Sequence, residues 1–252
     1  KQTETFFNLP SKTIAIFLLT TMFTHRSLLR QLIIKSKGHT YTMSSHSFKP
    51  SQTSLLPNIV LASTSPFRKQ LLNKLHLPFK QVAPNIDETP LKNESPQSMV
   101  ARLSKEKAQE IARHLPNSII IASDQTAVFQ NTPIGKPHTV QNAIKQLQQF
   151  SQQSITFYTG LAVVNTATQQ TFEAMDTTHV HFRKLSQEVI ENYIEIEQPL
   201  NCAGSFKSEG LGITLFEKIT SNDPNALIGL PLIELTHIFY QMGYPLPLKN
   251  TV

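Results

Sequence analysis

From residue 58 onward, the apolar positions alternate between short continuous runs and helical spacings. The run at 59–62 stops at small hydroxyl residues. Ser65 and Pro66 then form an N-cap and first-turn pair before a leucine-rich helical face at 71–75. This pattern predicts a strand, a polar turn and a helix. Free backbone N–H groups at such a helix N-terminus can bind an anion, although an ordinary strand-to-helix connection has the same pattern.

The same patterning continues along the chain, and we expect 58–252 to be one domain. It predicts helices at 96–114, 139–150, 186–197 and 231–242, and strands at 119–123, 127–129, 155–165, 171–182 and 213–219. The third and fourth of these strands are expected to form a long hairpin, because apolar residues alternate with period two in the second of them. The sequence therefore predicts an α/β fold with a mixed β-sheet and flanking helices.

The first 57 residues differ from this pattern. They contain an apolar run at 13–23, a basic stretch after it, and a linker rich in Ser, His, Thr and Pro at 44–57. The run is long enough for a signal peptide, but arginine and bulky residues follow it instead of a small-residue cleavage site. We interpret 1–57 as a poorly ordered extension translated upstream of a start at Met43 or Met22. A targeting segment or a surface-binding helix is the alternative.

Charge and cysteine content narrow the function classes. The net charge is +6, but residues 1–57 hold seven Lys/Arg and one acidic residue, which leaves 16 basic and 16 acidic residues in the remainder. This neutral main body argues against a nucleic-acid partner. No apolar run reaches the roughly 18–20 residues of a membrane span, so we expect no membrane partner. Cys202 is the single cysteine, which excludes an intrachain disulfide and favours a reducing, cytoplasmic location.

Asp124 is the sharpest candidate for catalysis. It follows the apolar strand at 119–123, and open α/β sheets bind ligands at the carboxyl ends of their strands. A carboxylate among apolar residues is partly desolvated, which raises its basicity and suits a general base acting on water. The alternative is a turn residue that caps Gln125 and Thr126.

Other charged residues fit a site for a metal and a polyanion. Asp87 and Glu88 lie in a proline-bounded loop and are hard oxygen ligands of the kind that Mg²⁺ or Mn²⁺ prefers, although a solvated turn has the same composition. Arg68 and Lys69 lie in the first turn of a helix, where they oppose the helix dipole unless a polyanion binds there. Lys136 lies on a stiff Gly-Lys-Pro turn that can hold its ammonium against a phosphate.

Two further lysines have positions that can reach a ligand. Lys107 lies at the edge of the apolar face of the helix at 96–114. Lys207 lies in an irregular loop at 204–210 that can close over a ligand. This loop matches neither a P-loop nor a dinucleotide-binding motif.

Taken in order, these motifs resemble those of the Maf nucleotide pyrophosphatases. The resemblance covers residues 58 to about 245 and rests on Leu61-Ala62-Ser63-x-Ser65-Pro66-x-Arg68, Asp87-Glu88, Glu106-Lys107-Ala108, Ser123-Asp124, Gly135-Lys136-Pro137, Tyr158-Thr159-Gly160 and Gly229-Leu230-Pro231-Leu232. It implies a mixed-sheet α/β fold with a deep nucleotide-binding cleft, similar to that of inosine triphosphatases. It implies hydrolysis of a nucleoside triphosphate between the α and β phosphates with Mg²⁺ or Mn²⁺. Members of the family often pair, so a homodimer is one option.

The resemblance also implies roles for individual residues. Asp124 would accept the proton of the attacking water. Glu88 would help to hold the metal, with or without Asp124, or the water. The phosphates would be held by Ser63, Arg68, Lys107, Lys136 and Lys207.

Within this family the chain is similar to the branch that acts on 7-methyl-GTP. Phe67, Gln125 and Glu209 stand where the dTTP/UTP branch typically has Arg, Thr and Gln, and they would set substrate specificity. N7-methylation leaves guanine positively charged, and an aromatic face at Phe67 attracts that charge by about 0.5–2 kcal/mol. The Glu209 carboxylate can accept from N1–H and the N2 amine of guanine, whereas it would repel the oxygens of a pyrimidine.

One residue departs from this branch, which usually has Trp in place of Phe67. A phenyl ring stacks less strongly, which favours lower affinity or looser selectivity. Two alternatives stay open: a dTTP/UTP pyrophosphatase of the same family, and a non-catalytic nucleotide-binding regulator of cell division.

Overall fold

The computed structural model describes residues 33–36, 39–42 and 56–248. The chain divides into two compact units, 1–54 and 55–252. In the first unit, β1 (Ile33–Ser36) pairs antiparallel with β2 (His39–Thr42). The apolar run and most of the linker lie outside the described residues, so our interpretation of 1–57 stays a prediction.

The second unit is built on a mixed seven-stranded sheet, which confirms the predicted α/β class. The strands follow the order β4-β3-β5-β7-β8-β9, and β6 pairs with β5. The β4-β3-β5 part is parallel and the rest is antiparallel. The strands are β3 (Asn58–Ala62), β4 (Phe79–Val82), β5 (Ser118–Phe129), β6 (Thr132–Ile134), β7 (Ser154–Asn165), β8 (Gln170–Phe182) and β9 (Phe216–Thr220).

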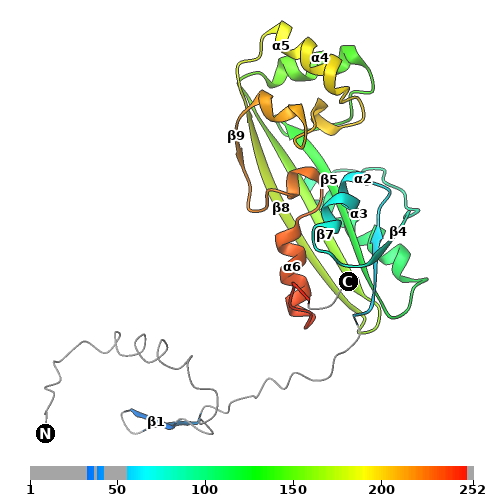
Figure 1. Cartoon of the computed structure of the whole chain (residues 1–252), viewed down its shortest axis with the longest axis vertical. Coiled ribbons are helices and arrows are strands. Elements are labelled where there is room, and N and C mark those ends of the chain that lie inside the picture. The colour runs from blue at the N-terminus through cyan, green and yellow to red at the C-terminus, as the bar shows by residue number, and fades with distance from the viewer. Residues whose placement is uncertain (1–32, 37–38, 43–55, 249–252) are drawn as a thin grey trace, which may run out of the picture. The chain divides into compact units, whose positions relative to one another are not determined.

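The helices form two groups along the long strands β5, β7 and β8 (Figure 1). The lower group in Figure 1 is α2 (Pro66–Asn73), α3 (Pro96–Ala112) and α6 (Leu232–Gln241), and the upper group is α4 (Val140–Phe150) and α5 (Gln187–Glu197). Short 3₁₀ turns complete the fold: η1 (Ala203–Ser205), η2 (Leu211–Leu215) and η3 (Ala226–Ile228). Each end of the strands therefore has its own lobe. Buried leucine and isoleucine residues dominate the core of one lobe, whereas phenylalanine rings pack edge-to-face in the other. Within the part of the chain that the structure describes, no helix is both long enough and apolar enough to cross a membrane.

The predicted helix starts are confirmed by their caps. The side chains of Ser65, Ser95, Thr139 and Ser186 each accept a hydrogen bond from the backbone N–H three residues later. Each such cap stabilises a helix by about 1 kcal/mol because it satisfies an otherwise free donor.

Two strand predictions were wrong at their boundaries. β5 is one continuous strand, not two pieces separated at Asp124. Its parallel pairing with β3 ends near Ile121, but its antiparallel pairing with β7 continues to Val128, so the backbone stays extended through the polar residues. The strand predicted to begin at 213 begins instead at Phe216, because the amide of Gly212 donates to Lys207 O and the following residues form a 3₁₀ turn.

α3 approaches the sheet closely at one glycine. A Cβ atom at Gly160 of β7 would lie 2.8 Å from the Ser104 Oγ and 2.9 Å from the Val100 carbonyl oxygen of α3. Gly160 pairs directly with Asp124 of β5. The absence of a side chain at Gly160 therefore sets how closely α3 lies beside the middle of β5.

We expect Gly160→Ala to destabilise the protein by about 1–3 kcal/mol, the usual cost of overpacking against backbone atoms. Urea unfolding measures this change. Gly135→Ala is the control, because a Cβ there would meet nothing within 4 Å and should change stability by no more than about 0.5 kcal/mol. Equal stability of the two variants would contradict the close approach of α3.

Candidate active site

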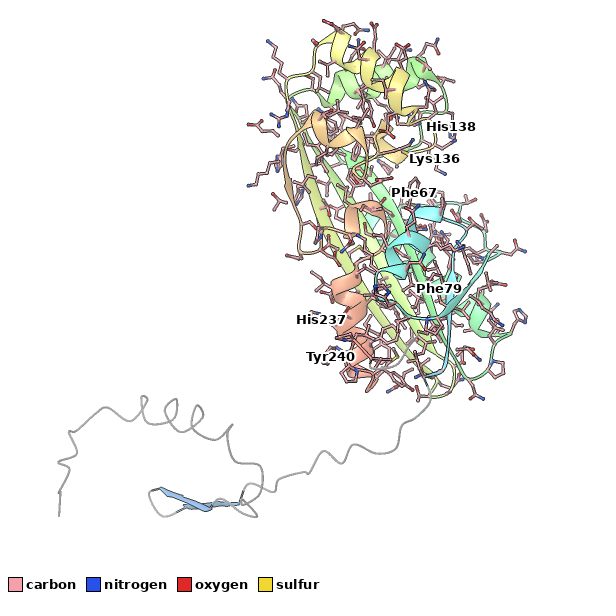
Figure 2. The ribbon with its side chains drawn as sticks, in the orientation of Figure 1. Phe67, Phe79, Lys136, His138, His237 and Tyr240 are labelled. Atoms are coloured by element: carbon pink, nitrogen blue, oxygen red, sulfur yellow. The ribbon has the colours of Figure 1, made fainter. Side chains whose placement is uncertain are left out.

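A cleft of about 700 Å³ opens between the two lobes. In Figure 2, Phe67 lies at the start of α2 and Lys136 lies on the facing loop of the other lobe. Among the described residues, the cleft wall includes nine of the predicted site residues: Ser63, Phe67, Arg68, Glu88, Lys107, Asp124, Gln125, Lys136 and Glu209. Asp87, Lys69 and Lys207 do not line the cleft, and the Asp87 carboxylate accepts from the Thr89 amide at 2.9 Å. The predicted deep cleft is confirmed, and segments far apart in the sequence form it.

The turn between β3 and α2 is tied to the loop after η3. The Ser63 Oγ accepts hydrogen bonds from the Ser65 amide at 3.1 Å and from Arg68 Nη1 at 3.5 Å. The Arg68 Nε donates to the Gly229 carbonyl at 2.8 Å. Burial lowers the pKa of Arg68, and the nearby charges of Asp124 and Glu88 oppose this effect. The guanidinium is thus held in the cleft wall next to two carboxylates.

Lys107 joins the two carboxylates predicted to do chemistry. Its Nζ lies 2.6 Å from Asp124 Oδ1 and 2.8 Å from Glu88 Oε1. Lys107 and Asp124 are only 6% and 8% exposed. A buried ammonium needs such partners, since an unpaired charge in the interior is strongly destabilising. The ion pair therefore fixes the position of the Asp124 carboxylate at the floor of the cleft.

Arg102 holds the loop that carries Glu88. Its guanidinium contacts both oxygens of Glu94, at 2.6 and 2.8 Å, and Glu106 at 3.1 Å, and it donates to the Thr89 carbonyl at 3.2 Å. This hydrogen bonding holds the pKa of Glu94 at about 2, well below its usual value. Sequence reasoning missed Arg102. The i,i+4 spacing of Arg102 and Glu106 was the available signal, but it does not reveal the Glu94 contact.

Ser123 and Gln125, on either side of Asp124, bind backbone carbonyls of η3 and of Gly229. The Ser123 Oγ lies 2.7 Å from Gly160 O and 2.8 Å from Gly229 O. The Gln125 Nε2 lies 2.9 and 3.0 Å from the carbonyls of Ala226 and Leu227. The middle of β5 is thereby fastened to η3 and the residues after it. Ser123 and Gly229 belong to the motifs of the family resemblance, but neither had a predicted role in the site.

The side chain of Lys207 is paired with Glu197 and does not line the cleft. Its ammonium is 2.7 Å from the Glu197 carbonyl oxygen and 3.2 Å from Glu197 Oε1. Glu209, two residues later, is exposed and lines the cleft. The contact of Lys207 with phosphate stays a prediction that this arrangement does not support.

The described residues contain no cluster of three or more His, Cys, Asp or Glu side chains that could hold a metal. Glu88 and Asp124 supply two carboxylates, which is the number that Mg²⁺ usually takes from a protein when substrate phosphates complete its shell.

Comparison with known proteins identifies the family. Residues 58–242 match the family model described as Maf-like protein. The chain belongs to the Maf family. The predicted resemblance is therefore confirmed.

Several Maf relatives cover most of this chain. The 7-methyl-GTP pyrophosphatase of Hydrogenovibrio crunogenus is 58% identical over 195 residues, which are 77% of this chain and 98% of the relative. Those of Colwellia psychrerythraea and Vibrio vulnificus are 54% and 56% identical, over 75% and 73% of this chain and 94% and 95% of the relatives. A HAM1 protein from Coxiella burnetii matches 51% of this Maf chain and 74% of its own, with 13% identity and a TM-score of 0.34.

The Glu94–Arg102 pair predicts a pH dependence of stability. The pKa of Glu94 is lower in the folded protein than its usual 4.5, so the pair stabilises the fold above that pH. As the pH falls from 4.5 toward 2, the difference in unfolding free energy between wild type and Glu94→Gln should shrink toward zero. Denaturant titrations across this range measure it. In an Arg102→Met background, the effect of Glu94→Gln on the unfolding free energy should no longer depend on pH in this range. If it still does, Arg102 is not the cause of the lowered pKa of Glu94.

Proposed function

We propose that this Maf protein is a nucleoside triphosphate pyrophosphatase that hydrolyses 7-methyl-GTP to the monophosphate and pyrophosphate. The observation that carries the proposal is the Asp124–Lys107–Glu88 cluster, which lies in one cleft with the cationic groups of Arg68 and Lys136. The names of the relatives support the same activity. The reaction removes a modified nucleotide from the pool.

The residues of the cleft divide the work of hydrolysis. Asp124 accepts the proton of the attacking water, and the Lys107 ammonium keeps its carboxylate in one orientation. Arg68, Lys136 and the Ser63 turn hold the phosphates and offset their charge. Phosphoryl transfer needs mainly this positioning and electrostatic stabilisation, because little covalent chemistry falls to the protein.

The carboxylates also fit the Mg²⁺ or Mn²⁺ that we include in the proposal. Glu88 and Asp124 share the Lys107 ammonium, so they lie close enough to serve one cationic centre. Two carboxylates leave positions for substrate phosphates and water. When bound, the metal supplies positive charge to the phosphate oxygens.

Two other residues of the cleft wall would recognise the base. Phe67 and Glu209 both line the cleft, and each matches one property of 7-methylguanine. The phenyl ring attracts the positive charge of the methylated base. The Glu209 carboxylate accepts from the guanine N1–H and N2 amine, which are donors that a pyrimidine lacks at these positions. Gln125 acts on selectivity through η3, whose carbonyls it holds.

Two further points belong to the proposal. We place the reaction in the cytoplasm, where a nucleoside triphosphate substrate is present. We expect a homodimer because members of the family often pair. Size-exclusion chromatography with light scattering measures the oligomeric state.

Pyrophosphate release from a panel of 7-methyl-GTP, GTP, dTTP, UTP, CTP and ATP, with Mg²⁺ or Mn²⁺, tests the activity and the base reading together. Wild type should prefer 7-methyl-GTP. Glu209→Gln should lower the kcat/KM ratio of 7-methyl-GTP to UTP by about tenfold or more, because a charge-assisted acceptor is lost. A preference for dTTP or UTP would keep the chemistry and overturn the base reading, and an unchanged ranking in the variant would refute the role of Glu209. Absence of turnover would favour the non-catalytic regulator.

Asp124→Asn tests the general base. We expect kcat to fall by about 100- to 10,000-fold, since an amide cannot accept the proton of water at neutral pH. Circular dichroism and nucleotide binding should show a folded protein. Glu173→Gln removes a carboxylate of β8 that pairs with Lys105, and serves as the matched control with unchanged kcat. A variant of Asp124 that keeps most of its kcat would refute the assignment.

A further inference from the structure

The loop that carries Glu209 is held by one carboxylate outside the cleft wall. The loop runs from η1 to η2, and Glu209 itself has little to fix it. Its side chain is exposed, and its carboxylate lies 3.4 Å from its neighbour Ser208. A residue that reads a base needs a defined position, since a hydrogen bond weakens steeply as its geometry departs from the ideal. The position of Glu209 must therefore come from contacts of the loop backbone.

Glu197, at the end of α5, contacts the loop on both sides of Glu209, at a lysine side chain before it and at a backbone amide after it. Its Oε1 lies 3.2 Å from the Lys207 Nζ, and its Oε2 accepts from the Leu211 amide at 2.8 Å. Each contact is two residues from Glu209, one before it and one after it. The Lys207 ammonium also donates to the Glu197 carbonyl at 2.7 Å. One side chain thus spans the segment that presents Glu209.

The surrounding residues are adapted to this carboxylate. A Cβ at Gly210 would lie 2.7 Å from Glu197 Oε2, so glycine lets the carboxylate lie against the loop backbone. The Tyr193 hydroxyl, one turn earlier on α5, accepts from the Lys207 amide at 3.0 Å. The Leu211 amide and the Lys207 ammonium also lower the pKa of Glu197, because both stabilise its charged form.

We propose that Glu197 is a positioning residue for base selectivity: it holds the 207–211 segment so that Glu209 faces the base, with Lys207 as its partner and not a phosphate ligand. The inference rests on the proposed function, because it takes Glu209 as the residue that reads the base. It adds a residue of α5 that does not line the cleft.

The test compares Glu197→Gln with Glu195→Gln in the full chain. Glu195 is an exposed carboxylate on the same helix, so it is matched in charge and location. Glu197→Gln should raise the KM for 7-methyl-GTP and lower the 7-methyl-GTP to UTP preference by about tenfold, with kcat within about twofold of wild type. Combining it with Glu209→Gln should lower the preference no further, because both act through one carboxylate. Glu195→Gln should match wild type.

Lys207→Met separates the two roles of the lysine, and it also serves if Glu197→Gln does not fold. If Lys207 acts as the partner of Glu197, Lys207→Met should reduce the preference of the enzyme for 7-methyl-GTP, and this effect should not add to that of Glu197→Gln. If Lys207 instead binds phosphate, Lys207→Met should lower kcat/KM for every nucleotide alike and leave the base preference unchanged. The second result would overturn the proposal.

Hydrogen exchange of the 207–212 amides gives a readout that is independent of substrate. Exchange should accelerate in Glu197→Gln and stay at the wild-type rate in Glu195→Gln. Wild type without a preference for 7-methyl-GTP would refute the proposed function, whereas unchanged exchange in Glu197→Gln would refute the positioning role whatever the substrate is.

Discussion

The arrangement of the cleft depends on one buried cation. The Lys107 ammonium is almost fully withdrawn from solvent, so it requires the carboxylates of Asp124 and Glu88 beside it. This requirement connects three separate parts of the chain: α3, the middle of β5 and the loop after β4. The close approach of α3 at Gly160 places the lysine at the correct depth, and Arg102 holds the loop that brings Glu88. The chemistry that we propose for Asp124 therefore begins with a constraint of the fold.

The long strands explain why the site lies between two lobes. β5, β7 and β8 pass from one hydrophobic core to the other, so the charged cleft residues of α2 and α3 face the loops that are built on α4 and α5. Ser123 and Gln125 fasten η3 to β5 on either side of Asp124. In the function that we propose, the catalytic carboxylate of Asp124 is thus carried on a rigid strand, whereas the loop that bears Glu209 recognises the base. Such a division lets selectivity change through the loop while the catalytic strand stays the same.

Much of the architecture follows from local patterns in the chain. The helix caps at Ser65, Ser95, Thr139 and Ser186 and the period-two hairpin lie where short-range rules place them, because capping and alternation involve residues close in sequence. The continuity of β5 through Asp124 and the start of β9 do not follow from such rules. Polar residues at 123–126 have the pattern of a turn, but pairing with β7 keeps them extended.

The candidate site divides in the same way. The sequence by itself determined which residues we propose for the chemistry, since carboxylates, lysines and a serine-proline helix start are chemical types that can be recognised in order along the chain. Only the tertiary structure decided their partners: Lys107 between Asp124 and Glu88, Arg102 on the acidic loop, and Lys207 on Glu197. The physical reason is that the chemical type of a charged side chain can be read directly from the sequence. Its partner is decided by which distant residues the folded chain brings within hydrogen-bonding distance.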